Sequence, residues 1–557
     1  MLVIGGGMKV MRKSAAVNIV AWLVLPMLMA LPGMTHAATG SVADAAVLLP
    51  IVPAIANPSP ANPESDLSQR NPLFLWRDSE SQRRLHVALV EPGPTAKADG
   101  ELKPELDWDT GEGKSYLIPA LEIPGFIVLL NAFDRVAFHD KEKNGKRVYT
   151  TNPSTFWDQL TRQDWTFDQD SFKVNQFGHP YEGATMYGLA RSSGLNFWQS
   201  LVYSNVGSFL WEMAGETSRP SINDQITTGN AGSLLGEALF RMAGLVLEEN
   251  PSNPSLGHQF AAAVISPPTA FNRFAFGERF KTIYPNHQPV TLWRCMLGGS
   301  LDTHSTNLSP AVSSPSRDGN VIAEFSMAYG LPGKPGYRYD RPLDYFDFQI
   351  STRARTHNLV ETLTIRGLLK GTDYHIGDDY RGIWGLYGSY DYISPYLYRV
   401  SSTALSLGTT GQYWAAPGVA LQGSILGGVG FGATGLETDA EEERGYHYGA
   451  TPQMLLTFNA LFGKLAIFDL TGRAYYVSAL GGDGSHGSEL VFRGQAGLTF
   501  RIYRNHGLGV HYSESIRDTN YANIPERYRS EGTVSLVYTF LSDVSLGAVE
   551  WRGAASR

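Results

Sequence analysis

The feature that most constrains the fold is an alternation of apolar and polar residues that recurs through the second half of the chain. After about residue 289, segments of ten or more residues place apolar side chains at every second position, with polar or charged residues between them. The clearest segment puts Leu490 and Phe492 on one face and Glu489 and Arg493 on the other. Successive side chains of a strand point to opposite faces, so each such segment predicts a strand with one apolar face.

Two folds use strands of this kind, a soluble sandwich and a membrane barrel. The segments are longer than the five or six residues usual in soluble sheets, and aromatic residues such as Trp384 and Tyr475 lie near their ends. Short turns such as residues 504–507 alternate with longer polar stretches such as 517–529. We count about twelve strands and expect an antiparallel transmembrane β-barrel over residues 289–541, with one face toward lipid and charged side chains in the lumen.

The N-terminus predicts export. Lys9, Arg12 and Lys13 precede an uncharged apolar stretch at residues 16–31, and small residues follow at positions 35–37. This order is typical of a signal peptide, which we place at residues 1–37. The alternative is a transmembrane anchor, but proline and glycine interrupt the stretch and we find no second apolar span of about 20 residues. We therefore expect a protein of the bacterial outer membrane.

Composition narrows the possible partners. The net charge of −8 gives no basic field, so we expect no nucleic acid. Cys295 is the single cysteine, which excludes an intramolecular disulfide. It should be a free thiol on the lipid-facing side of the first strand, opposite Arg294. The expected partners are outer-membrane lipid and, during insertion, the barrel-assembly machinery, while the oligomeric state stays open.

The first half of the chain has a different organisation. Residues 38–71 are rich in proline and predict a flexible linker, and residues 72–167 form a mixed segment with one apolar helix from about Ile118 to Phe138. A helical period follows in a domain at residues 168–288, whose helices we expect to pack together or against something else. The fold class is thus α+β, a small helical domain before the barrel, with a C-terminal tail at residues 542–557.

Several uncommon residue groups occur in order in the helical domain. They are N-x-x-G-H-P-x-x-G at residues 175–183, W-E-x-x-G-E at residues 211–216, and P-S-I-N-D at residues 220–224, which a threonine follows. Together they resemble a bacterial family known only as a domain of unknown function, family 3943, over roughly residues 168–241. The resemblance implies an envelope protein whose remainder is barrel-like, and it supplies no activity.

The same groups hold the candidate site residues. One histidine, three carboxylates and a serine have the chemistry for acid–base catalysis or for a divalent metal. These catalytic candidates are His179, Glu212, Glu216, Ser221 and Asp224. The candidates for a ligand site or polar network are Asn175, Tyr181, Arg191, Glu237 and Arg241. We predict no cofactor with a recognised motif, although a divalent metal stays open.

A structural role is the alternative for all of these residues. Carboxylates cap helices, Ser221 with Asp224 is typical of a helix N-terminus, and Arg191 and Arg241 can pair with Glu212 or Glu237 in a buried network. We expect at least one of Glu212 and Glu216 to be substantially buried, and both to be paired with His179, Arg191 or Arg241 and so to stay ionised. On that basis, Glu212→Gln should lower the stability of the helical domain.

Three functions fit the sequence. The first is a non-enzymatic envelope protein in which the helices cap or plug the barrel. The second is an outer-membrane enzyme that acts on lipid or lipopolysaccharide through His179 and nearby carboxylates. The third is a channel for a small solute whose lumen arginines set an anion preference, and no catalytic or nucleotide motif decides among the three.

Overall fold

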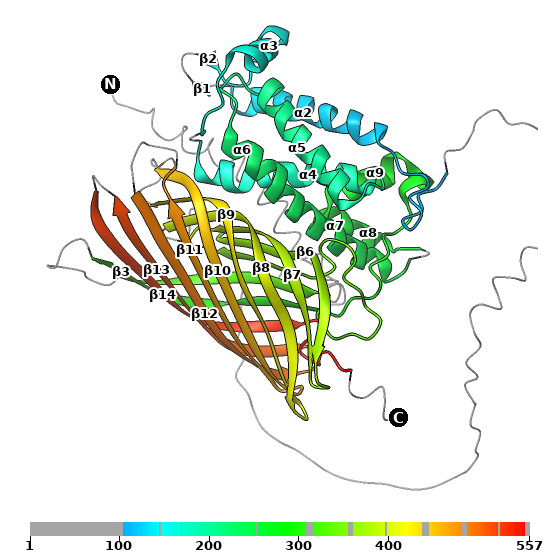
Figure 1. Cartoon of the computed structure of the whole chain (residues 1–557), viewed down its shortest axis with the longest axis vertical. Helices are drawn as coiled ribbons and strands as arrows, with labels where there is room; N and C mark the ends of the chain where they lie inside the picture. Colours follow the sequence, from blue (N-terminus) through cyan, green and yellow to red (C-terminus); the bar gives the residue numbers. More distant parts are fainter. Residues whose placement is uncertain are drawn as a thin grey trace, which may run out of the picture. The chain divides into compact units, whose positions relative to one another are not determined.

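A helical region precedes a closed β-barrel, as the sequence predicts (Figure 1). The computed structural model describes residues 104–551, with short gaps at 140, 144–145, 169, 252, 308–315, 355–359, 396–397, 437–444, 481–486 and 522–523. The predicted signal peptide at residues 1–37 and the predicted linker at residues 38–71 lie outside the described residues.

The helical region consists of α-helices interrupted by two short π-helical segments. Its α-helices are α2 (Leu117–Ala137), α3 (Pro153–Arg162), α4 (His179–Ser192), α5 (Phe197–Ala214), α6 (Ile222–Ile226), α7 (Gly232–Glu248), α8 (Leu256–Ile265) and α9 (Pro267–Ala275). The π-helical segments are η1 (Val174–Gly178) and η2 (Thr227–Ala231), and the remaining short elements are η3 (Gly277–Phe280), β1 (Glu142–Lys143) and β2 (Lys146–Arg147).

Local sequence explains where these helices begin. Pro180 lies in the first turn of α4, where a missing backbone donor costs nothing. Asn196 forms a capping box at the start of α5, and Ser221 caps α6 through its side chain. Helix α7 is buried almost all round, which is the environment of a helix that is apolar on every face. It forms the centre of the helical region.

Twelve antiparallel strands close into one barrel, and each strand pairs with its neighbours in sequence. The strands are β3 (Thr291–Asn307), β4 (Ser316–Tyr329), β5 (Phe346–Arg353), β6 (Thr362–Ile376), β7 (Tyr380–Ile393), β8 (Tyr398–Ala416), β9 (Val419–Leu436), β10 (Tyr446–Phe462), β11 (Ala466–Ser478), β12 (Gly487–Tyr503), β13 (His506–Tyr521) and β14 (Ile524–Leu541). Pairing of β14 with β3 completes the circle, so no sheet edge is left open.

The two faces of the strands have opposite character. Polar side chains such as Arg294, Asp469 and Gln453 line the lumen. On the outside, large apolar side chains are exposed along β8 to β14 and on β3, for example Leu407 and Leu498. An exposed apolar band is the surface that a membrane barrel presents to lipid. The predicted register is therefore confirmed, and the free thiol of Cys295 is on the face opposite Arg294.

The helical region packs on the outer wall of the barrel. Leu234 of α7 lies against Gly388, which is on the outward face of β7. Apolar residues of η1 and α7 form one core with outward-facing residues of β4 to β7 and of β9 and β10. Figure 1 shows α7 beside β6 and β7. The prediction that the helices cap or plug the barrel is not confirmed, because the barrel side chains they meet point away from the lumen.

The barrel's own side chains cross the lumen instead. Arg294 on β3 is 2.6 Å from Asp469 on β11, and the Tyr475 hydroxyl on β11 donates to Asp391 on β7 at 2.8 Å. Toward the mouth where β3 connects to β4 and β5 to β6, one ion-pair layer joins five residues, four on separate strands and one directly before β6. These are Asp302, Arg353, Glu361, Arg493 and Glu531. Between such bridges lies a cavity of about 210 Å³, lined by both polar and apolar side chains.

The C-terminal tail fills the opposite mouth, where short turns join β6 to β7, β8 to β9 and β10 to β11. After β14, residues 542–551 fold back against the lumen side of these strands. The Val549 carbonyl accepts hydrogen bonds from Gln412 at 2.8 Å and from Trp414 at 3.1 Å, and the Gly547 carbonyl accepts one from Gln422. Leu546 is buried beside Trp414. The tail that the sequence sets apart from the last strand is thus part of the barrel interior.

Helix α2 corrects a second expectation. The sequence analysis finds no span of membrane length beyond the signal peptide, yet α2 has 21 residues and a mean hydropathy of 1.6. Only 28% of its most apolar 18-residue stretch is buried. Pro124, Glu122 and Asp134 interrupt the apolar sequence, so the segment looks less apolar than its exposed face is. The sequence analysis misses this span for that reason.

Candidate functional site

The structure brings the three residue groups of the helical domain together around the start of α4. The first group forms η1 and the beginning of α4, the second ends α5, and the third forms α6 and leads into η2. Gly183 of α4 lies so close to the backbone of Thr228 that a Cβ atom there would overlap the Thr228 carbonyl oxygen. The glycine thus allows α4 and η2 to touch, and π-helical turns of this kind often occur at functional sites.

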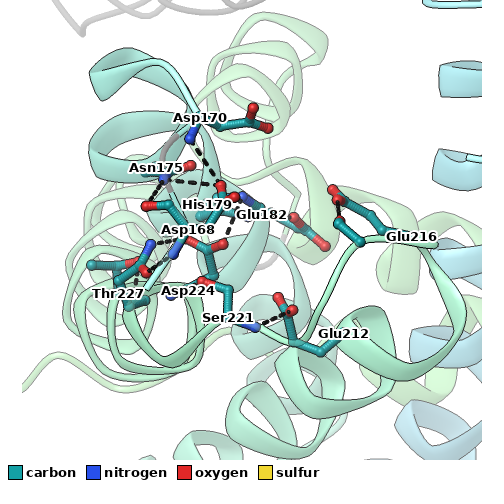
Figure 2. Close-up of polar contacts among 12 residues, drawn as sticks. Asp168, Asp170, Asn175, His179, Glu182, Glu212, Glu216, Ser221, Asp224 and Thr227 are labelled. Atoms are coloured by element: carbon teal, nitrogen blue, oxygen red, sulfur yellow. Dashed lines mark hydrogen bonds and ion pairs between the residues drawn. The ribbon is translucent and has the colours of Figure 1, made fainter. Parts of the chain in front are cut away.

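His179 lies at the centre of this arrangement, between two carboxylates (Figure 2). Its Nδ1 is 3.3 Å from Glu182 Oε2, and its Nε2 is 3.7 Å from Asp224 Oδ2. Burial by itself would lower the pKa of His179, but Asp224 and Glu182 outweigh it, and the pKa lies well above 6.5. His179 is therefore an imidazolium that balances part of a buried negative charge.

The hydrogen-bond partner of Glu212 is a backbone N–H group, whereas the sequence predicts a charged side chain. Its Oε2 accepts a hydrogen bond from the Ser221 backbone N–H at 2.7 Å. Burial, followed by the charges of Asp224 and Glu216, raises the pKa of Glu212 well above its usual value. The sequence analysis offers His179, Arg191 and Arg241 as partners of an ionised Glu212. Both arginines pair elsewhere, and the raised pKa of Glu212 favours its protonated form.

Glu216 is also separated from the arginines. Its Oε2 accepts a hydrogen bond from the Ser218 hydroxyl at 2.6 Å, and burial raises its pKa although Lys141 opposes the shift. Figure 2 shows Glu216 apart from His179 and Asp224. Glu216 lies beyond the end of α5, after the C-cap residue Gly215. The two glutamates therefore do not share a helix face, and they meet different groups.

Ser221 and Asp224 form the predicted helix cap. The Ser221 hydroxyl accepts from the Asp224 N–H at 3.1 Å, and Asn223 donates to Asp224 Oδ1 at 2.7 Å. Burial raises the pKa of Asp224 to about 7, although His179 opposes the shift. Because Ser221 Oγ caps α6, the serine is held in a structural role, and the arrangement lacks the geometry of an exposed nucleophile.

Asn175 connects the site with the barrel. Its side-chain amide donates to the hydroxyl groups of Tyr446 and Tyr448 at 2.9 and 3.1 Å. The Tyr446 hydroxyl in turn donates to the Asp170 carbonyl at 2.8 Å. Tyr181 packs at the edge of the apolar core that joins the two regions, and burial raises its pKa to about 12. Asn175 therefore acts as a polar anchor on the outer wall.

Arg191, Glu237 and Arg241 form a second network, away from His179. Both arginine Nε atoms are 2.8 Å from an oxygen of Glu237, and Arg241 Nη1 is 2.9 Å from Asp344 in the loop between β4 and β5. The two arginines outweigh burial and lower the pKa of Glu237. The sequence analysis left Glu212 and Glu237 open as partners of the two arginines, and in the structure both arginines contact Glu237. This network also anchors the helices to the barrel.

Sequence reasoning missed four charged members of the first network. Glu182 lies one helical turn after His179, a spacing that the sequence does reveal. Lys141 is 2.7 Å from Asp170, and burial brings Asp134 into the same charge field. No sequence pattern links Lys141 with Asp170, because 29 residues separate them.

The geometry allows proton storage more readily than metal binding. In the described part of the chain, no group of three or more histidine, cysteine, aspartate or glutamate side chains converges in a way that would hold a metal ion. His179, Glu182, Glu212, Ser221 and Asp224 are all buried. What the residues do share is a surplus of carboxylates over cations, so that protons are retained near neutral pH.

Several known proteins resemble parts of this chain. The family model described as Domain of unknown function (DUF3943) matches residues 164–268, and no curated protein matches. Among solved structures, the TodX monoaromatic hydrocarbon channel deltaS2 mutant is 8% identical with a TM-score of 0.19, over 51% of this chain and 94% of its own. The NalP autotransporter translocator domain from Neisseria meningitidis is 14% identical with a TM-score of 0.21, over 45% and 89%.

A third structure, the KdgM porin, is 6% identical with a TM-score of 0.19, over 42% of this chain and 97% of its own. Scores this low support no inference about function, so the barrel rests on its own strand order. The family match is more informative, since it includes all the candidate site residues from Asn175 to Arg241. The helical region thus matches the model of the domain of unknown function DUF3943 over residues 164–268, and in this chain it precedes a closed twelve-stranded barrel.

Proposed function

We propose that this protein is a non-conducting barrel of the bacterial outer membrane that holds the DUF3943 domain against its outer wall. The exposed apolar band on β8 to β14 supports the membrane location, as does the export signal expected at residues 1–37. Insertion would then require the barrel-assembly machinery. The role is structural: the barrel anchors the helical domain in the membrane.

The observation that carries this proposal is the filled lumen. The tail occupies one mouth through hydrogen bonds of Gln412, Trp414 and Gln422. Toward the other mouth, Arg353 binds Glu361 at 2.7 Å and Glu531 at 3.2 Å, residues that come from different parts of the wall. A water-filled path for a hydrated ion would have to break both barriers. This arrangement argues against the alternative of an anion channel, because the lumen arginines Arg294, Arg353 and Arg493 already pair with carboxylates.

The enzymatic alternative has weaker support. It requires His179 to act on lipid or lipopolysaccharide, yet the residue is buried and its ring is held between Glu182 and Asp224. The hydroxyl group of Ser221 caps a helix, and that of Thr227 donates to the Asn223 carbonyl. A buried acid–base pair of this kind suits a stabilising network better than an active site that must admit a substrate.

Planar-bilayer recordings of the full-length protein test the proposal. We expect no channel steps from the intact chain, although heat-modifiable mobility on gels confirms a folded barrel. Deletion of residues 542–557 should permit brief openings, and its combination with Arg353→Ala should lengthen them, because each change removes one barrier. Large and stable conductance from the intact protein would contradict the proposal, and an anion preference that Arg493→Glu reverses would favour the channel instead.

A further inference from the structure

We infer that the outward face of α2 and α5 contacts the acyl chains of the bilayer beside the barrel, an inference that rests on the membrane location proposed above. We call this surface the lateral face. It consists of large apolar side chains that are half exposed or more, at Leu117, Leu121, Val128, Val136, Val202 and Val206. The helical domain would then contact lipid itself, in addition to being held by the barrel.

The lateral face is almost free of charge. Helix α2 carries Glu122 and Asp134, but Glu122 is half-buried and Asp134 is buried, and Arg135 in the last turn is the one fully exposed charge of the helix. Helix α5 has no charged residue from Phe197 to Trp211. Soluble proteins seldom expose a continuous apolar surface of this extent without a partner. The face therefore requires an apolar neighbour.

The length of the face matches a bilayer. From Leu117 to Val136 the helix extends over 20 residues, about 30 Å at 1.5 Å per residue, and the hydrocarbon core is also about 30 Å thick. Exposed aromatic residues lie at both ends. Tyr116 precedes α2 and accepts a hydrogen bond from Gln199 in the first turn of α5, while Trp165 stacks on Phe209 in the second half of α5. Tryptophan and tyrosine are enriched at such positions, at the two membrane interfaces.

Continuity with the barrel's apolar band identifies the neighbour as lipid. The helices cover outward-facing residues of β4 to β7 and of β9 and β10, while exposed apolar side chains continue along the rest of β8 to β14 and on β3. Lipid that surrounds the barrel cannot reach the covered sector, and there it meets the outer side of the helical domain. A charged or polar face would make that position unfavourable, and the lateral face is neither.

Spin-label accessibility in the full-length protein tests this inference. In a Cys295→Ala background, single cysteines replace Val128 on α2, Val202 on α5, Leu498 on the outward face of β12 and the exposed Glu278 of η3. Each labelled protein is reconstituted in vesicles of phosphatidylcholine and phosphatidylglycerol. We expect the ratio of collisions with oxygen to collisions with a water-soluble nickel chelate to be several-fold higher at Val128, Val202 and Leu498 than at Glu278.

The outcomes separate the inference from the function on which it rests. If Leu498 has a lipid-like ratio while Val128 and Val202 resemble Glu278, the helices lie in water and the inference fails, but the membrane barrel stands. If Leu498 also resembles Glu278, the membrane location itself is wrong. If Val128 and Val202 are shielded from both reagents, a protein surface covers the lateral face, which overturns the inference as well. The gel mobility and circular dichroism of each variant show that it is folded.

Discussion

Two buried polar networks fasten the helical domain, and they differ in how their charges balance. The network around Glu237 combines three arginines, counting Arg341, with two carboxylates. The network around His179 has the opposite excess, since one imidazolium and Lys141 face several carboxylates. Accordingly, the pKa of Glu237 is lowered while that of Asp224 is raised to about 7.

The difference shows how one domain can keep one carboxylate permanently ionised and another one ready to take up a proton. An arginine cannot release its proton at any physiological pH, so the Glu237 network keeps its charges and suffers if one is removed. The His179 network can adjust its protonation after a change, because burial raises the pKa of Asp224 to about 7. We therefore expect the first network to respond to mutation and the second to respond to pH.

The largest effect should follow from Glu237→Gln. The substitution leaves Arg191 and Arg241 buried without their shared carboxylate, and breaking a buried pair in this way costs about 3–5 kcal/mol. Calorimetry of the full chain should show the helical transition at a much lower temperature, with the barrel transition unchanged. Glu249→Gln is the matched control, since its side chain is 48% exposed and the change should cost less than about 0.5 kcal/mol. Equal effects of the two substitutions would refute the contrast between the networks.

A smaller loss should follow from His179→Gln. The change removes the imidazolium between Glu182 and Asp224, but protonation of a carboxyl group can offset part of the loss. We expect a cost of about 2–3 kcal/mol at pH 7, below that of a broken arginine pair, and a smaller cost at pH 5. Thermal midpoints of the variant and the wild type at both pH values measure this. A loss that is the same at both values would show that the neighbouring carboxyl groups do not adjust.

The sequence predicts the barrel well because its signal is repeated. Each strand shows the same alternation, so an error in one segment does not alter the conclusion, and the inward direction of Arg294 follows from its position in the period. The cap at Ser221 and the capping box at Asn196 are equally local. These features depend on residues within a few positions of one another, which is why they can be recognised without the fold.

The missed features depend on residues that are far apart in the chain. Nothing in the sequence shows that Asn175 reaches Tyr448 across 273 positions, or that the outward face of β7 is covered by helices instead of lipid. The predicted arginine partners of Glu212 are wrong for the same reason. The sequence reveals that Glu212 and Glu216 are four residues apart, but helix packing decides which arginines lie near them.

A third effect, of about 2 kcal/mol, should appear when wild-type protein is taken from pH 5 to pH 7. Asp224 has a raised pKa of about 7 in the folded state, so the folded domain keeps a proton that the unfolded chain has already lost at pH 5. His179 also has a raised pKa and acts in the same direction above pH 6.5. Stability should therefore fall as pH rises, which thermal midpoints will show. A midpoint that rises toward pH 7 would contradict the raised pKa values, and Asp224→Asn should flatten the dependence.

The smallest effect should follow from Glu212→Gln, the reverse of what the sequence suggests. Burial raises the pKa of the Glu212 carboxyl group well above its usual value and favours the protonated form. A neutral amide therefore resembles that form, and its oxygen can still accept the hydrogen bond from the Ser221 N–H. We expect a change below about 1 kcal/mol in the stability of the helical domain, within the range of a modified hydrogen bond. Glu212→Ala is the sharper companion, because it leaves the buried Ser221 N–H without its acceptor and should cost about 1–3 kcal/mol. If Glu212→Gln instead destabilises the domain as strongly as Glu237→Gln, the carboxylate is ionised and the two networks obey the same rule.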